Sequence, residues 1–199
     1  MSTRQVLDRL LATRNEHPER LTEIDHEIWR QFGATRAVWV LDMCGFSRLT
    51  MRYGITHFLA MIHRLHGLAR PIIAGGGGTV VKTEADNVFA TFDDVGKAVA
   101  AAKHLHQQLA AANAFLPEDW DLHASIGIGY GEILLVGAHD FYGNELNIAS
   151  KLGEDVAGPG ETYLTAAAYA AAQAAGVALT VEKRDIPISA MTVTAYKIV

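Results

Sequence analysis

Asp42-Met-Cys-Gly-Phe-Ser47 and Lys82-Thr-Glu-Ala-Asp86 are the two stretches on which the expected fold depends. The first follows the run AVWVL and the second follows TVV, and both runs are typical of buried strands. Two carboxylates are therefore expected at neighbouring strand ends, beside a glycine turn with backbone N–H groups. Such a site suits a pair of divalent metal ions that hold a nucleoside triphosphate.

Composition excludes several classes of protein. The chain has 199 residues, of which half are hydrophobic and 20% are charged, as expected for one globular domain with an appendage. The net charge is −5 and the basic residues form no run, so neither nucleic acid nor an anionic membrane surface is an expected partner. No apolar stretch approaches the roughly 20 residues that cross a bilayer. The single cysteine, Cys44, excludes an intrachain disulfide, and we expect a cytoplasmic protein.

Hydrophobic spacing predicts the order of the elements. Residues 3–32 have the pattern of two helices, with Pro18 at the start of the second and Gly33 at its end. The segments that follow are a strand at 36–42, a helix at 47–70, a loop at 75–78, a hairpin formed by 79–85 and 87–92, a helix at 98–112, and a strand pair at 122–137 that turns at Gly131.

This order is βαββαβ, the ferredoxin-like arrangement. A helix at 143–154, a strand at 161–165, a helix at 166–175 and strands at 177–182 and 191–199 are expected to follow. The fold class is therefore α/β (α+β), with extra C-terminal strands. We expect residues 1–35 to form an N-terminal helical extension and residues 36–199 to form the main domain.

Four segments, in this order, resemble the class III nucleotidyl cyclases, the catalytic domains of adenylate and guanylate cyclases. The segments are D-x-x-G-F-S at 42–47, G-G-x-V-V-K-T-x-x-D at 77–86, G-E-I-L-L-V-G at 131–137 and Y-G-N-x-L-N-I-A-S-K at 142–151. The resemblance covers about residues 36–198. It implies a cyclase homology domain that converts a nucleoside triphosphate to a cyclic nucleotide and pyrophosphate.

The resemblance also implies roles for the acids and the glycine turn. Asp42 and Asp86 would bind two Mg²⁺ or Mn²⁺ ions per active site, and Met43 belongs to the same predicted metal set. Phosphate oxygens would be held by the backbone N–H groups of Cys44, Gly45, Phe46 and Ser47. Taken alone, Asp42 could equally cap a helix and Asp86 could belong to a hairpin turn.

Other matched positions concern the substrate. Lys82 and Asp140 match the lysine and aspartate that read the adenine edge, because a lysine donates to N1 and a carboxylate accepts from the N6 amine. The pair therefore indicates ATP, with GTP or a pyrimidine triphosphate as the alternative. Solvent exposure of both side chains without a binding role also remains open. Asn147 matches the asparagine that orients the ribose, and Lys151 stands where the family places an arginine on the transferring phosphate.

Three positions depart from the family pattern. Lys151 keeps the charge of the expected arginine but lacks its planar fork, Ala85 replaces a glycine before the second acid, and residues 188–191 lack a phosphate-binding lysine. Lys183, Arg184 or Arg48 could supply that cation. These departures leave a second hypothesis open, in which the domain binds nucleotide or a protein partner without turnover.

The family builds each active site from two subunits, one giving the metal acids and the other the base-reading residues. This chain carries both sets, so the resemblance implies a head-to-tail homodimer with two equivalent sites. The helices at 3–32 could buttress the dimer, transmit a signal or simply add a packing layer. No sensor domain is recognisable in the sequence, so an unidentified regulatory partner is possible.

Overall fold

The fold is organised around one mixed sheet. The computed structural model describes residues 3–117, 120–188 and 191–199 of the chain, and within these ranges it leaves out the side chains of residues 46–49, 188 and 191. Along the sheet the strands follow the order β2-β3-β1-β4-β6-β8-β7, and β5 pairs with the end of β4. The strands are β1 (Gly33–Met43), β2 (Gly78–Glu84), β3 (Asn87–Phe92), β4 (Ala124–Val136), β5 (Asp140–Tyr142), β6 (Thr162–Thr165), β7 (Val181–Ile188) and β8 (Met191–Ile198). β4 and β6 run parallel, and the other neighbours are antiparallel.

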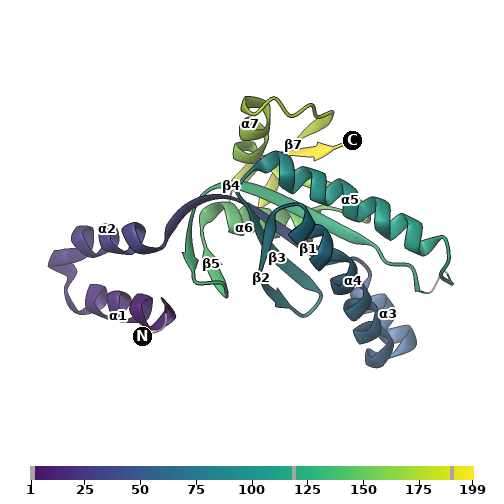
Figure 1. Cartoon of the computed structure of the whole chain (residues 1–199), viewed down its shortest axis with the longest axis horizontal. Coiled ribbons are helices and arrows are strands. Elements are labelled where there is room, and N and C mark those ends of the chain that lie inside the picture. The colour runs from purple at the N-terminus through teal and green to yellow at the C-terminus, as the bar shows by residue number, and fades with distance from the viewer. Residues whose placement is uncertain (1–2, 118–119, 189–190) are drawn as a thin grey trace.

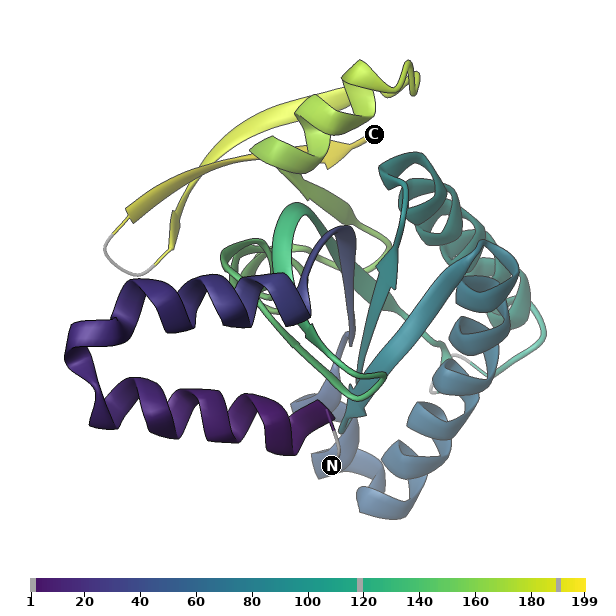
Figure 2. The ribbon, with the colours of Figure 1, turned by 60° about the vertical axis from the view of Figure 1, so that its left-hand side comes forward.

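Helices lie on both faces of this sheet (Figures 1 and 2). They are α1 (Thr3–Glu16), α2 (Leu21–Phe32), α3 (Phe46–Tyr53), α4 (Ile55–Gly75), α5 (Val95–Asn113), α6 (Asn144–Lys151) and α7 (Ala166–Ala174), with a short 3-10 turn at Pro18–Arg20 and a π-type turn, η3, at Leu152–Val156. Residues of α4, α5 and α7 share the main core with one sheet face, whereas Leu146 and Ala149 of α6 pack on the other. No helix in the described ranges is long and apolar enough to cross a membrane.

The side-chain alternation of β1 separates the two faces. Trp39 and Leu41 are fully buried in the main core beneath α4 and α5, whereas Val38 and Val40 are buried on the face that carries α6. Because successive residues of a strand point to opposite faces, Asp42 belongs to the α6 face. The same alternation that buries the strand therefore assigns the acid to one side of the sheet.

The helical hairpin of α1 and α2 packs against the far end of β4 and projects from the sheet (Figure 2). Its apolar contact is a cluster of Leu7, Ile24, Ile28, Phe32 and Val136. Arg14 ties the two helices together by donating two hydrogen bonds to the carboxylate of Asp25, at 2.5 and 3.1 Å. The hairpin thus has its own small core, joined to the sheet through β4.

Most of the expected architecture is confirmed. The βαββαβ order, the two N-terminal helices, the β2–β3 hairpin and the C-terminal additions are all present, and they give the mixed α/β fold that the sequence predicts. β1 begins at Gly33, three residues before the boundary expected at residue 36. The loop expected at 75–78 is shorter, because α4 extends to Gly75 and β2 begins at Gly78.

The prediction of a strand pair at 122–137 is wrong. β4 is a single strand of 13 residues, and Gly131 lies opposite Arg36 of β1 within an unbroken ladder instead of forming a turn. The glycines of β4 serve a different purpose, which is to admit α6 and η3 to close contact with the sheet. A Cβ atom on Gly127 would lie 1.9 Å from the carbonyl oxygen of Ala149 and 2.8 Å from the backbone nitrogen of Gly153.

Two other boundaries need correction. The helix expected at 47–70 is broken into α3 and α4 at Gly54, whose φ of +80° is a conformation that glycine adopts without strain. The strand expected at 177–182 begins only at Val181, because Val177 and Leu179 instead pack against the main core as irregular chain.

The contact at Gly127 yields a test of how α6 is held. Gly127→Ala is expected to lower the free energy of unfolding by about 3 kcal/mol or more, because the added methyl meets backbone atoms that cannot rotate away. Gly67→Ala is the matched control, since nothing lies within 4 Å of its Cβ position on helix α4. We expect it to stabilise the protein by about 0.5–1 kcal/mol. Urea unfolding of both variants measures the difference, and equal stabilities would contradict the packing account.

Candidate active site

Strand pairing brings the two predicted metal acids to one edge of the sheet. Asp42 is the penultimate residue of β1, and Asp86 lies in the turn between β2 and β3. Since Leu41 pairs with Val88, the antiparallel register carries Asp42 toward the residues that precede Val88, which include Asp86. The carboxylate at the end of β1 and the carboxylate just before β3 therefore lie at the same edge of the sheet.

The turn that carries Asp86 is conformationally unusual. Ala85 has a φ of +50°, and no other non-glycine residue in the described ranges has a positive φ. This region costs an L-residue about 1 kcal/mol and is usually left to glycine. The departure at Ala85 therefore leaves the turn intact, with a small amount of strain next to the acid.

Asp42 and Asp86 line an open cavity of about 730 Å³. The other lining residues are Met43, Cys44, Gly45, Asn87, Ser125, Glu154, Ala157 and Pro159. Glu154 of η3 is a third acid at this site, which the sequence analysis missed; its Oε1 accepts a hydrogen bond from the side-chain amide of Asn87 at 3.3 Å. No sequence motif marks it, because it reaches the cavity through the close packing of η3 on β4 at Gly127 and Gly153.

Negative charge in this cavity is poorly compensated. The pKa of Asp42 is raised to about 7, first by burial and then by the carboxylates of Asp86 and Glu154. Burial also raises the pKa of Asp86, and burial followed by the charge of Asp155 raises that of Glu154. Carboxylates held together without a cation favour protonation, so the cavity is electrostatically suited to a divalent ion.

The negative charge of this cavity suits metal ions, but its side chains alone do not form a complete set of ligands. Hard cations prefer carboxylate oxygens, which Asp42, Asp86 and Glu154 provide. Within the described part of the chain, however, no three His, Cys, Asp or Glu side chains stand close enough together to form a ready-made metal site. Met43 lines the cavity too, although its side chain is buried in the core. Two protein carboxylates with substrate phosphates would complete the coordination, as Mg²⁺ sites commonly do.

The glycine turn after β1 offers fewer N–H groups than expected. The backbone N–H of Cys44 donates to the carbonyl of His123 at 2.9 Å, so it is already engaged in the sheet. Gly45 adopts a φ of +96° and precedes α3, whose first N–H groups have no partner within the helix and are the remaining candidates for a phosphate. The side chains of Phe46 and Ser47 lie outside the described residues. The Cys44 thiol has a pKa raised by burial, as expected of a packing residue and not a nucleophile.

Lys82 and Asp140 come together elsewhere on the same sheet. The Nζ of Lys82 lies 3.3 Å from Oδ1 of Asp140 and 2.8 Å from Oε1 of Glu84, and it also sits 5.1 Å from the ring centre of Phe89. The expected base-reading residues thus form one ion pair. Neither residue lines the cavity of Asp42, so one chain presents them as a separate half-site.

Comparison with known proteins agrees with this geometry. No family model matches the chain. It is 32% identical over 124 residues to putative adenylate cyclase 3 of Rhizobium meliloti, which covers 62% of this chain and 21% of that protein. It is 30% identical over 116 residues to an adenylate cyclase of Streptomyces coelicolor, covering 58% and 29%. The crystal structure of an adenylate/guanylate cyclase/hydrolase from Silicibacter pomeroyi superimposes with a TM-score of 0.72 and 25% identity, covering 84% of this chain and 97% of that one.

The chain contains a class III nucleotidyl cyclase domain. It spans less than a third of the length of the curated relatives that it matches.

The cyclase domain exposes the remaining family positions on α6. Asn147 and Lys151 are both exposed and stand four residues apart, and Lys151 is paired with Asp155 at 2.9 Å. The C-terminal segment expected to carry a phosphate-binding lysine includes residues 189 and 190, which lie outside the described residues. Of the possible substitutes, Arg184 is paired with Glu182 at 2.6 Å, and the side chain of Arg48 is among those not described.

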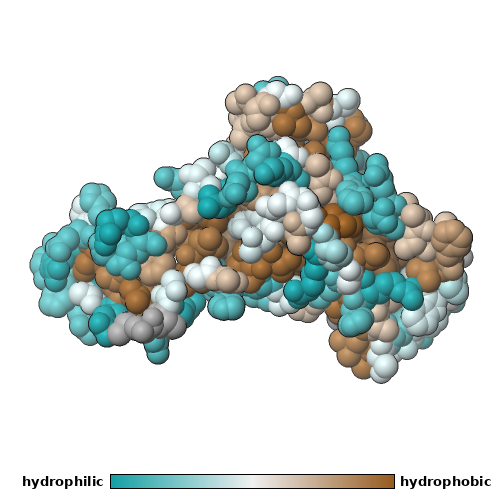
Figure 3. Space-filling view, viewed as in Figure 1, coloured by the Kyte–Doolittle hydropathy of each residue, from teal (hydrophilic) through white to brown (hydrophobic). Residues whose placement is uncertain are grey.

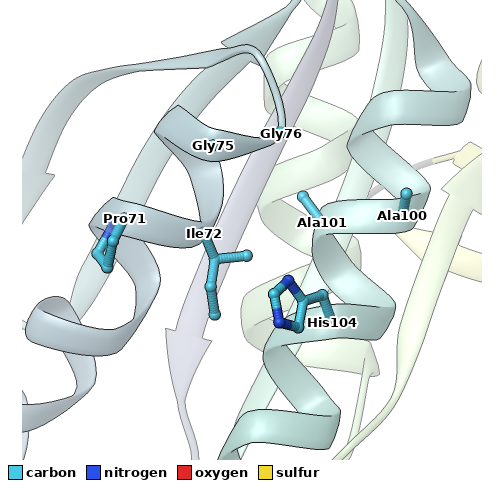
Figure 4. A pocket seen from close by; sticks show the side chains of 7 residues that line it. All are labelled: Pro71, Ile72, Gly75, Gly76, Ala100, Ala101 and His104. Atoms are coloured by element: carbon cyan, nitrogen blue, oxygen red, sulfur yellow. The ribbon is translucent and has the colours of Figure 1, made fainter.

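A second cavity of the cyclase domain, of about 430 Å³, lies between α4 and α5 (Figure 4). Its walls are Pro71, Ile72, Gly75, Gly76, Ala100, Ala101 and His104. His104 points from α5 toward Ile72 of α4, and no carboxylate faces this space (Figure 4). It lacks the acids of the first cavity and is not a candidate for metal-dependent chemistry.

The electrostatics of Asp42 predict how pH and metal affect stability. In EDTA, the folded state keeps the Asp42 proton up to about pH 7, whereas the unfolded chain releases it near 3.8. The folded state binds more protons between these values, so the free energy of unfolding should fall as pH rises from about 4 to about 7. Asp42→Asn should flatten this decline.

Mn²⁺ at pH 8 should raise the Tm of the wild type more than that of Asp42→Asn, because the cation relieves repulsion among ionised carboxylates. Asp93→Asn, which removes an exposed acid at the opposite end of β3 from Asp86, is the control for charge alone. Equal Mn²⁺ shifts in the wild type and Asp42→Asn would contradict a metal site at Asp42.

Proposed function

We propose that the domain is an adenylate cyclase that converts ATP to 3′,5′-cyclic AMP and pyrophosphate. The observation that carries the proposal is the cavity in which Asp42 and Asp86 converge with too little positive charge to balance them. The names of the similar proteins and the spacing of the family motifs support it. Residues 36–199 would form the catalytic domain and residues 1–35 its helical extension. A triphosphate substrate and a single cysteine favour the cytoplasm as its place of action.

The proposed chemistry is an in-line attack of the ribose 3′-hydroxyl on the α-phosphorus, with pyrophosphate as the leaving group. Two Mg²⁺ or Mn²⁺ ions, when bound, would lower the pKa of the hydroxyl and neutralise the triphosphate. Asp42 and Asp86 would hold these ions, and Glu154 would add a third negative charge near them. Gly45 and the first turn of α3 would direct N–H groups at the phosphates. Asn147 would orient the ribose, and Lys151 would face the charge that develops on the phosphate.

Base selection is proposed to rest on Lys82 and Asp140. The two side chains already form an ion pair, so one donor and one acceptor stand side by side. Adenine offers an acceptor at N1 beside a donor amine, which matches this order, whereas guanine offers the reverse. ATP is therefore the proposed substrate. GTP is the second candidate, because a structurally similar protein carries both adenylate and guanylate cyclase in its name.

Assembly as a head-to-tail homodimer is proposed because the two half-sites are separate in one chain. In one chain, Lys82 and Asp140 do not line the cavity that holds Asp42. A second copy turned about a twofold axis could place its base-reading pair over that cavity, and the reverse arrangement would then follow by symmetry. Large apolar side chains at the surface favour association: Met51, Ile55 and Leu59 are 84, 55 and 56% exposed. Hydrophobic side chains also gather at the α3–α4 end of the molecule (Figure 3).

Purified protein with Mn²⁺ should form cyclic AMP from ATP in preference to cyclic products from GTP, CTP or UTP. Mass spectrometry of the products measures this. Asp42→Asn should reduce the rate by roughly 10²-fold or more, since it removes a charge from the proposed metal site. Asp93→Asn, at the opposite end of β3 from Asp86, should leave the rate unchanged. A different cyclic nucleotide would keep the chemistry and overturn the base assignment.

Lys151→Arg separates a slow enzyme from a domain that only binds. A planar guanidinium adds one charge-assisted hydrogen bond to the phosphate, so kcat should rise by about tenfold if the reaction occurs at all. No cyclic product from either form, with any of the four nucleotides, would favour the non-catalytic nucleotide-binding or partner-binding module.

Mixing two inactive variants tests the shared site. Asp42→Asn removes a metal acid and Asp140→Ala removes a base-reading residue, so each homodimer should be inactive. A mixed dimer would contain one intact site, and an equal mixture should recover about a quarter of the wild-type rate. Asp42→Asn mixed with Asp86→Asn is the control, because both lesions fall in the same half-site and no recovery is expected. Recovery in the control, or none in the test, would contradict the head-to-tail arrangement.

A further inference from the structure

The first turn of α1 reaches the residue that is proposed to read the base. Arg4 donates from Nη1 to the phenol oxygen of Tyr142 at 2.6 Å, and the same nitrogen lies 3.4 Å from Oδ2 of Asp140. The guanidinium also stands 6.0 Å from the centre of the Tyr142 ring. An element that precedes β1 in the chain therefore contacts β5 directly.

Asp140 is held by donors on both of its oxygens. Oδ1 accepts from the backbone N–H of Phe141 at 3.0 Å and faces Lys82 at 3.3 Å. Oδ2 accepts from the hydroxyl of Tyr142 at 2.5 Å, and Tyr142 in turn accepts from Arg4. Partial burial raises the pKa of Asp140, but the bonds from Tyr142, Phe141 and Lys82 together lower it, which keeps the carboxylate an acceptor. Arg4, Tyr142 and Asp140 thus form a relay.

The hairpin is anchored well enough to fix this relay. Leu7 and Leu10 of α1 pack with Val136 and Leu134 near the end of β4, directly before the turn that leads to Asp140. Thr3, Arg4 and Asp140 also share the wall of a cavity of about 630 Å³ with residues 136–139. α1 therefore forms part of the surroundings of the base-reading pair.

We propose that Arg4 is a positioning residue for base recognition, which fixes the carboxylate of Asp140 through Tyr142 and makes the α1–α2 hairpin part of the nucleotide-specificity apparatus. The proposal rests on the proposed cyclase function. Its physical basis is that the ion pair between Lys82 and Oδ1 does not by itself fix the rotation of the carboxylate: without the relay, Oδ2 can turn toward Lys82 as well, and Lys82 is then held by both oxygens instead of the base. The relay keeps Oδ2 on Tyr142 while Oδ1 faces Lys82, so the carboxylate presents one fixed orientation to adenine.

The test compares Arg4→Ala with Arg30→Ala. Arg30 is the matched control because it is an exposed hairpin arginine paired with an acid of its own helix, Glu27, at 2.6 Å. Arg4→Ala should raise KM for ATP by about three- to tenfold, the effect of one hydrogen bond, with a smaller change in kcat. It should also lower the preference for ATP over GTP. Arg30→Ala should change neither.

Tyr142→Phe tests whether Arg4 acts on Asp140 through the phenol of Tyr142. If Arg4 acts through the phenol, Tyr142→Phe alone should raise KM similarly, and the double variant should be no worse than either single one. Arg4→Lys should recover part of the loss. Hydrogen exchange of residues 138–143, followed by mass spectrometry, provides a readout that does not depend on turnover, and it should be faster in Arg4→Ala and unchanged in Arg30→Ala.

The outcomes separate this inference from the proposed function. Faster exchange in Arg4→Ala with unchanged KM and unchanged ATP preference would overturn the positioning role while leaving the cyclase intact. If the wild type makes no cyclic product, competition of ATP and GTP against the fluorescent probe mant-ATP decides: a lower ATP preference in Arg4→Ala supports the role, and an unchanged one overturns it. A wild type that neither binds mant-ATP nor forms product overturns both proposals.

Discussion

The pairing of β1 with a strand on each side is the constraint on which the rest of the structure depends. All eleven residues of β1, Gly33–Met43, pair with β4, and residues 37–41 also pair with β3. A strand with neighbours on both edges cannot slip by one residue without exchanging its buried and exposed faces. The register therefore fixes Asp42 relative to the turn of Asp86. At the other end of the same strand, it fixes the entry of the α1–α2 hairpin beside Leu134.

Asp42 and Asp140, the acids of the two half-sites, have opposite electrostatic surroundings. Asp140 has donors on both oxygens, and its pKa is lowered, whereas Asp42 faces other acids and has a pKa of about 7. An unpaired carboxylate in a partly buried place costs stability, and proteins retain such groups mainly where function requires them. The contrast supports a cation at Asp42 and a neutral ligand edge at Asp140.

The local hydrophobic pattern predicted most helices and strands. It failed where a contact between residues distant in sequence determines the structure. The alternation and β-branched content of residues 36–42 and 79–92 were sufficient to place β1, β2 and β3, and hence both candidate metal acids, Asp42 and Asp86. Gly131 suggests a turn by composition, yet it pairs with Arg36 of β1 within an unbroken ladder. Gly127, four residues earlier on β4, leaves the space that α6 requires. The engaged N–H of Cys44 was equally hidden, because its partner, His123, lies far along the chain.

Glu154 and Arg4 show the same limit within the site itself. Each reaches its place through a helix packed on β4: Glu154 through the close approach at Gly127 and Gly153, and Arg4 through the apolar cluster around Val136. Family motifs record residues that share a segment, so neither residue appears in them. β4 thus contacts elements of both half-sites, because α6 and η3 pack on its middle and α1 packs on its end. A shift of the α1–α2 hairpin would reach Asp140 first, because Asp140 pairs with Val136, the last residue of β4, and it would reach the half-buried Asp42 and Asp86 only later.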